Sequence, residues 1–149
     1  MNYLADTSAV RRILRRQIGE PWPGRVARGQ VAICPPVEAE LMPGLRADRD
    51  HERFFTMLNQ TFGRVPALDD PWPRIIGVQR ELLGIGHHRG PSPMDILIAL
   101  TAEQHRLTLI HVDDDFAAIA KVRPEISMLR LQPAEPRQGL SGGSGPDRP

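Results

Sequence analysis

Hydrophobic and polar residues follow one another along the chain in a pattern that predicts short buried strands separated by amphipathic helices. Short apolar runs rich in strand-forming residues are bounded by polar residues, Pro or Gly, and the segments between them carry apolar residues at helical spacing. The predicted strands cover residues 3–5, 30–34, 107–112 and 126–131, with 64–68 as an extended segment or short strand. The predicted helices cover residues 9–18, 37–46, 51–62, 71–83, 93–105 and 115–121.

Strands that alternate with helices favour parallel pairing, because each helix carries the chain back to the start of the next strand. We therefore expect an α/β fold, a three-layer sandwich with a central, mainly parallel sheet. A chain of 149 residues is one domain of ordinary size. The pattern stops at residue 132, and the rest is dense in Pro, Gly and Ser. The sequence predicts a folded domain over residues 1–132 and a disordered tail over residues 133–149.

The composition excludes several classes of protein. A single cysteine, Cys34, rules out an intramolecular disulfide and a cysteine-rich zinc module. No stretch approaches the roughly 20 apolar residues that span a bilayer, and the first residues do not resemble an export signal. We expect a cytoplasmic protein without a membrane partner.

Four acidic residues are predicted to meet at one edge of the sheet. Asp6 and Asp113 each follow a predicted strand, at the end where the strand leaves the sheet. Glu40 and Asp95 lie in the first turn of predicted helices that begin at that same edge. Because parallel strands share a carboxyl edge, all four side chains belong there.

Each acid also has a structural interpretation. Asp95 completes a capping box with Ser92, and Asp6 or Asp113 alone would be a turn residue. Glu40 is harder to explain in this way, because it shares an otherwise apolar helical stripe, where a carboxylate is costly without a compensating partner. The convergence of all four acids at one edge favours a functional site over four separate structural roles.

Clustered carboxylates repel one another and favour bound cations. Without Cys or clustered His, oxygen ligands select Mg²⁺ or Mn²⁺ rather than zinc. Such ions suit the hydrolysis of phosphodiester bonds. The first functional hypothesis is therefore a metal-dependent nuclease.

Several segments, in this order and spacing, resemble the PIN-domain ribonucleases, and within them the VapC-type toxins of bacterial toxin–antitoxin pairs. The matching segments are "LADTSAV", "PPVEAELMPG", "SPMDILIALTAEQHRLTLIHVDDDF" and "ISMLRL". Together they span residues 1 to about 132. The resemblance implies catalytic acids at Asp6, Glu40, Asp95 and Asp113. These four fall on the metal-binding acids of the family, with Asp115 a fifth member of the group or a substitute for Asp113, and the ligands of the ion itself are expected to be Asp6, Asp95, Asp113 and Asp115.

The resemblance also suggests roles for residues around the acids. Ser8 matches a small hydroxyl residue close to the site in relatives, and otherwise would be a hydroxyl at a helix start. His111 is a departure, because relatives often carry Thr or Ser at that position. Arg11, Arg12 and Arg15 form a basic face that either contacts RNA phosphates, together with Ser8, or is simply solvated. His87 and His88 lie in a Gly-rich loop that either touches RNA or has no role.

The resemblance further implies cleavage of RNA, such as tRNA or another structured RNA, with Mg²⁺ or Mn²⁺ as cofactor. It implies a homodimer and a small antitoxin whose peptide lies in a hydrophobic groove. The alternative is a non-catalytic α/β module that binds RNA or a partner and holds a structural ion. A phosphoacceptor receiver domain fits poorly, because the strand 30–34 ends in Cys-Pro-Pro instead of an Asp.

Overall fold

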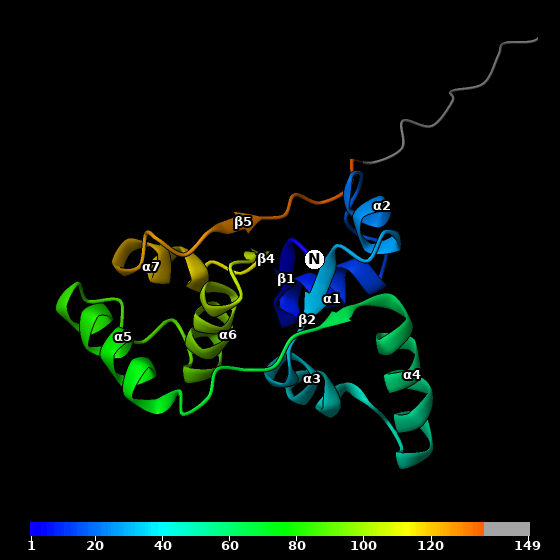
Figure 1. Ribbon diagram of the computed structural model, residues 1–149, viewed down its shortest axis with the longest axis horizontal. Helices are drawn as coiled ribbons and strands as arrows, with labels where there is room; N and C mark the ends of the chain where they lie inside the picture. The colour runs from blue at the N-terminus through cyan, green and yellow to red at the C-terminus, as the bar shows by residue number, and fades with distance from the viewer. Residues whose placement is uncertain (136–149) are drawn as a thin grey trace, which may run out of the picture.

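The computed structural model describes residues 1–135, which form an α/β domain around one parallel sheet (Figure 1). Its five strands pair in the order β3-β2-β1-β4-β5, and every pair is parallel. The strands are β1 (Tyr3–Ala5), β2 (Val31–Ile33), β3 (Gly63–Arg64), β4 (Thr108–His111) and β5 (Met128–Arg130). The predicted α/β fold with a parallel sheet is confirmed.

Within residues 1–135, seven α-helices cover the two faces of the sheet. They are α1 (Thr7–Leu14), α2 (Trp22–Ala27), α3 (Pro35–Leu41), α4 (His51–Thr61), α5 (Trp72–Gly84), α6 (Pro93–Gln104) and α7 (Asp115–Val122). Helices α1–α4 lie on one side of the strands and α5–α7 on the other, as expected for right-handed crossovers on this strand order (Figure 1). This is the predicted three-layer arrangement.

The core lies where the central strands meet the helices. Leu4, Ile33 and Leu109, on neighbouring strands, are fully buried. Helix α6 is apolar on nearly all sides, and seven consecutive residues from Ile96 to Ala102 are buried. A helix of this composition belongs inside the domain, and α6 packs against β4 and against both α5 and α7. Its buried position fixes where its first turn lies at the sheet edge.

Two helix boundaries differ from the prediction because proline is well tolerated in the first turn of a helix. No helix was predicted between residues 18 and 37, yet α2 begins at Trp22, with Pro23 in its first turn. Pro35 and Pro36 were expected to close the second strand, but they start α3. Helix α3 therefore begins two residues earlier than predicted and ends at Leu41.

The chain leaves β5 and runs back along the end of α1. Pro133 forms an isolated antiparallel bridge with Ile18, and the Ala134 N–H donates to the Gln17 carbonyl at 2.8 Å. These contacts differ from the prediction that the disordered tail starts at Pro133. The predicted tail beyond residue 135 lies outside the described residues. Within residues 1–135, no helix is long and apolar enough to cross a membrane.

Candidate active site

Asp6 lies at the junction where β1 ends and α1 begins. Its carboxylate caps the helix, because Oδ1 accepts a hydrogen bond from the Ala9 N–H at 2.8 Å. The residue is only 4 % exposed. Asp6 therefore lies at the carboxyl edge of the sheet as predicted, and its structural role is that of a helix cap rather than of a turn residue.

Ser8 holds the Asp6 carboxylate in place. Its hydroxyl lies 2.8 Å from Oδ1 and 2.7 Å from Oδ2 of Asp6, to which it donates. The same hydroxyl accepts a hydrogen bond from the Val112 N–H at 3.1 Å, just beyond β4. Ser8 thus joins the first acid to the strand end that carries Asp113, which makes it a positioning residue in this geometry.

Burial raises the pKa of Asp6 to about 6, because removal from water disfavours the charged carboxylate. The hydrogen bonds from Ala9 and Ser8 oppose this rise, and the nearby charge of Asp113 adds to it. Asp6 therefore becomes fully ionised only above about pH 6, unless a cation offsets its charge.

We expect Ser8→Ala to raise the pKa of Asp6 further, because the hydroxyl stabilises the charged carboxylate. Cation binding must displace the proton from Asp6, so the loss of Mn²⁺ affinity on acidification should begin at a higher pH in the variant than in the wild type. Calorimetric titrations with Mn²⁺ between pH 5 and 8 measure this shift. An unchanged pH dependence would contradict the positioning role of Ser8.

Glu40 does not lie in the first turn of its helix as predicted. Because α3 begins at Pro35 and ends at Leu41, Glu40 lies in its last turn. It still contacts α1, because the Arg11 guanidinium in the last turn of that helix donates to the Glu40 backbone carbonyl at 3.3 Å. The bounds of α3 therefore differ from the prediction, but Glu40 still lies near Asp95.

The Glu40 side chain carries a buried oxygen, Oε1, that has no hydrogen-bond partner among residues 1–135. Burial raises its pKa, and the nearby charge of Asp95 adds to the rise. The Thr7 hydroxyl and the Arg11 guanidinium lie close enough to oppose it. Thr7 Oγ1 is also buried and, like Glu40 Oε1, has no hydrogen-bond partner of normal geometry within residues 1–135, a feature that the sequence analysis missed. The two oxygens lie near each other, and a ligand bound there would complete their hydrogen bonding.

Asp95 lies in the first turn of α6 and forms the predicted capping box. Its Oδ2 accepts a hydrogen bond from the Ser92 N–H at 2.8 Å, and Ser92 Oγ accepts from the Asp95 N–H at 3.1 Å. The structural interpretation of this acid is therefore confirmed. The cap uses only Oδ2, and Oδ1 makes no hydrogen bond within the described part of the chain.

Three consecutive acids follow β4, and they differ in their surroundings. Asp113 Oδ1 accepts a hydrogen bond from the Asp115 N–H at 3.0 Å, which closes the turn that starts α7. Burial raises the pKa of Asp115, and the charges of Asp113 and Asp95 add to it. Asp114 is exposed and pairs with Arg130. Both Asp113 and Asp115 thus border the other acids, Asp113 next to Asp6 and Asp115 next to Asp113 and Asp95.

The acidic run offers a matched pair of substitutions. Asp113→Asn should lower RNA cleavage by about a hundredfold or more, because it removes a charge that faces Asp6. Asp114→Asn should leave cleavage within about twofold, because its carboxylate faces Arg130 at the surface. Initial rates on one oligoribonucleotide compare the two. Equal losses in both variants would contradict the assignment.

His111 supports the turn after β4. Its Nδ1 lies 2.9 Å from the Asp113 carbonyl oxygen, to which it donates, and its ring packs on Phe116 with centroids 5.0 Å apart. Burial lowers the pKa of His111, which favours the neutral ring. The residue that replaces the expected hydroxyl therefore fixes the backbone that carries the acids.

The five acids form a connected electrostatic group. Charge coupling links Asp6 to Asp113, Glu40 to Asp95, and Asp115 to both Asp113 and Asp95. Within residues 1–135, no three His, Cys, Asp or Glu side chains are already gathered closely enough to form a metal-binding group. The donor set, with hard carboxylate oxygens and a buried unpaired Glu40 oxygen, nevertheless fits a hard divalent cation such as Mg²⁺ or Mn²⁺.

The predicted basic face begins beside the acids and leads away along α1. Arg11 contacts α3 through the Glu40 carbonyl, whereas Arg12 and Arg15 are exposed. Arg25, on α2, lies over the rings of Tyr3 and Trp22, with its guanidinium carbon 5.0 and 4.6 Å from the two centroids. This stacking occupies Arg25 in packing, whereas Arg12 and Arg15 present their charge at the surface.

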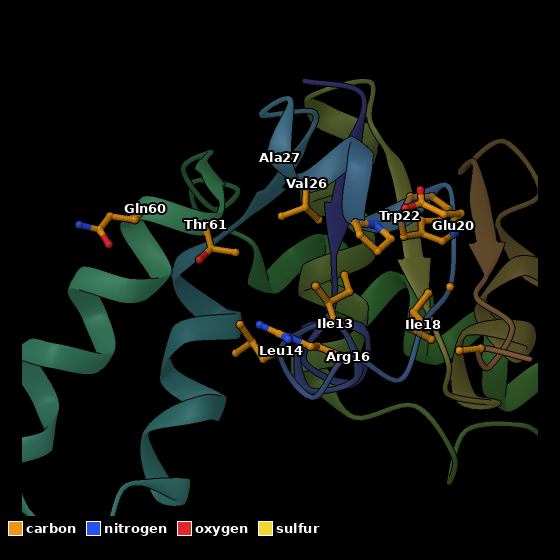
Figure 2. A pocket seen from close by; sticks show the side chains of 13 residues that line it. Ile13, Leu14, Arg16, Ile18, Glu20, Trp22, Val26, Ala27, Gln60 and Thr61 are labelled. Atoms are coloured by element: carbon orange, nitrogen blue, oxygen red, sulfur yellow. The ribbon is translucent and has the colours of Figure 1, made fainter. Parts of the chain in front are cut away.

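A largely apolar groove of about 810 Å³ lies at the other end of α1 (Figure 2). It is bounded by the end of α1, by α2 and by the end of α4. Ile13, Leu14, Trp22 and Val26 supply apolar side chains, and Gln60 and Thr61 flank the opening. Ala134, on the returning chain, forms part of its wall.

Comparisons with known proteins agree with this geometry. The model of the PIN domain family matches residues 3–122. Ribonuclease VapC2 of Mycobacterium tuberculosis (strain CDC 1551 / Oshkosh) is 38% identical over 122 residues, which cover 79% of this chain and 84% of that protein. Ribonuclease VapC21 of the same strain is 30% identical over 120 residues, with coverages of 80% and 87%. A crystal structure of DNA-bound VapBC from Salmonella typhimurium shares the fold, with a TM-score of 0.66, 17% identity and coverages of 87% and 98%.

The fold, the acid-lined sheet edge and the family match define a PIN-domain protein. Within that class, the chain belongs to the family of the VapC ribonucleases. The resemblance noted from the sequence motifs is thereby confirmed.

Proposed function

We propose that the protein is a metal-dependent endoribonuclease and the toxin of a toxin–antitoxin pair. The observation that carries this proposal is the group of acids around Asp6, a buried carboxylate whose pKa of about 6 reflects a site poorly able to hold negative charge alone. Its relatives named Ribonuclease VapC support the substrate class. The proposed reaction is hydrolysis of an RNA phosphodiester bond.

The proposed cofactor is Mg²⁺ or Mn²⁺, held by Asp6, Asp95 and Asp113, with Asp115 as a further or alternative ligand. When bound, such an ion polarises the phosphoryl group and activates water for attack. Glu40 contributes the unpaired buried oxygen Oε1, which is placed to accept a proton or a ligand hydrogen bond. Ser8 and His111 keep the carboxylates and their backbone in position.

The proposed RNA contacts lie on the basic face of α1. Arg11 and Arg12 lie on α1 and Arg15 is at its C-terminal cap, and Asp6 caps the start of the same helix. Phosphate contacts of this kind position a strand without reading its sequence. RNA is the substrate, so we place the protein in the cytoplasm.

The proposed protein partner is a small antitoxin that inserts an apolar segment into the groove between α1, α2 and α4. The apolar lining of the groove supports this assignment (Figure 2). We also propose a homodimer, for which α5 offers a surface. Trp72, Ile76 and Leu83 form one exposed stripe along that helix, and they are 60%, 54% and 59% exposed.

The proposal is tested by incubating total cellular RNA with purified, antitoxin-free protein in Mg²⁺, Mn²⁺ or EDTA. Metal-dependent cutting into discrete fragments supports the nuclease, and the fragment ends identify the target. Mn²⁺ binding without cutting would favour the alternative of a non-catalytic binding module with a structural ion.

A further inference from the structure

A second pocket, of about 380 Å³, is lined in part by Asp115. It is formed by the loop that follows α5 and by α7. Helices α5 and α7 are neighbours on the same side of the sheet (Figure 1). The residues that line it include His87, Arg89, Gly90, Asp115 and Lys121. The pocket therefore extends from the acid site to the Gly-rich loop, whose residues have no role in the proposed reaction.

Positive charge gathers on one wall of this pocket. Lys121 Nζ lies 3.5 Å from His87 Nε2 and donates to it, and Arg89 lines the same space. Across residues 1–135, neither Lys121 nor Arg89 forms an ion pair with a carboxylate. Asp114 is already paired with Arg130. The wall thus presents two cations that have no anionic partner of their own.

The backbone turns the loop tightly at the end of α5. The His87 N–H donates to the Leu82 carbonyl at 2.9 Å, and Gly86, with φ of +75°, makes the turn that ends α5. At Gly90, a Cβ atom would lie 2.8 Å from Asp115 Oδ1. The absence of a side chain at Gly90 lets the loop approach Asp115 closely.

We propose that this pocket binds a backbone phosphate of the RNA strand next to the bond that is cut. The proposal rests on the proposed nuclease function and names a substrate contact for it. A phosphate in the pocket would accept hydrogen bonds from Lys121 and Arg89 and remain adjacent to Asp115. Phosphate is favoured over a neutral group because a flexible lysine and a planar guanidinium are both suited to bind it.

The sequence offers a direct probe, because Lys121 is the only lysine in the chain. An amine-specific acylating reagent therefore modifies Lys121 and the α-amine of the purified chain, and the α-amine serves as an internal reference. The experiment uses full-length protein in EDTA with a saturating single-stranded oligoribonucleotide, whose binding is followed by fluorescence anisotropy. Bound RNA should slow acylation of Lys121 about fivefold or more relative to the α-amine, as measured by mass spectrometry of the peptides.

Variants give a second readout in Mn²⁺. Lys121→Ala should raise the KM for the oligoribonucleotide about fivefold, and Lys121→Arg should restore it, because the charge is kept. The salt dependence of binding should weaken by about one phosphate contact, a slope change of roughly 0.7 for a single strand. Arg80→Ala is the matched control, since it removes an exposed cation from α5 outside the pocket and should leave KM unchanged.

The outcomes separate this inference from the proposed function. If the wild type binds and cuts RNA but Lys121 is acylated at the same rate with and without RNA, the phosphate site is wrong and the nuclease stands. The same holds if Lys121→Ala and Arg80→Ala alter KM equally. If the wild type neither binds nor cuts RNA in any metal, both proposals fail together.

Discussion

Asp6→Asn is expected to abolish RNA cleavage while making the metal-free protein more stable at neutral pH. Cleavage should fall by about a hundredfold or more, because the substitution removes a charged ligand at the centre of the acid group. The helix cap should survive, because an Asn oxygen can still accept from the Ala9 N–H. A loss of activity together with a gain in stability is expected when buried, mutually repelling carboxylates serve function at the expense of stability.

The pH dependence of that stability gain follows from the raised pKa of Asp6. The folded protein binds the Asp6 proton up to about pH 6, whereas the unfolded chain releases it near 3.8. Protonated Asp6 therefore stabilises the wild type below pH 3.8, and this stability is lost as the pH rises through 6. Above pH 6, Asp6→Asn should be more stable by about 2–3 kcal/mol, and near pH 4 the two should be nearly equal.

Urea unfolding in EDTA at pH 4 and pH 8 measures both points, with Asp114→Asn as the control whose stability should follow that of the wild type. A loss of about 1 kcal/mol in Asp6→Asn at both pH values, with cleavage intact, would mean that Asp6 is only a helix cap.

Glu40→Gln is expected to produce the second large effect, a loss of cleavage of about a hundredfold. The substitution keeps the shape of the side chain but removes the charge from the buried oxygen that has no hydrogen-bond partner among residues 1–135. Glu38, on the same helix, provides the matched control, because its carboxylate pairs with Arg64 at the edge strand β3. Glu38→Gln should keep cleavage within about twofold.

Initial rates on one oligoribonucleotide at saturating Mn²⁺ separate these two variants. Circular dichroism and thermal melting confirm that both are folded. If Glu40→Gln cuts RNA as fast as Glu38→Gln, the buried Glu40 oxygen has a structural role and the proposed active site must exclude it.

The positions of Asp6 and Asp113 at one edge of the sheet could be predicted because they depend only on the direction of the strands. Asp6 and Asp113 follow strands that the apolar runs identify, and parallel pairing then requires both to lie at one edge. Asp95 could also be placed, because Ser92 and the following proline mark a helix start. These features are local, and each leaves a clear pattern in the sequence.

Glu40 shows where such reasoning stops. Its place beside Asp95 was predicted, but its position in the last turn of α3 was not. Two consecutive prolines, Pro35 and Pro36, are compatible with both the end of a strand and the start of a helix. The contact between Ser8 and Val112 joins residues 104 positions apart, and no periodicity encodes it. The unpaired Thr7 hydroxyl depends in the same way on packing between α1 and α3.

The most direct test of the central claim follows Mn²⁺ binding and RNA cleavage in the same preparation. Mn²⁺ is titrated into the wild type, Asp6→Asn and Asp114→Asn, and the cleavage rate of one oligoribonucleotide is measured at each concentration. The account predicts that binding and cleavage saturate together in the wild type and in Asp114→Asn, and that both are lost in Asp6→Asn. Mn²⁺ binding by the wild type without cleavage of any RNA would contradict it, because the acids would then hold an ion without catalysing hydrolysis.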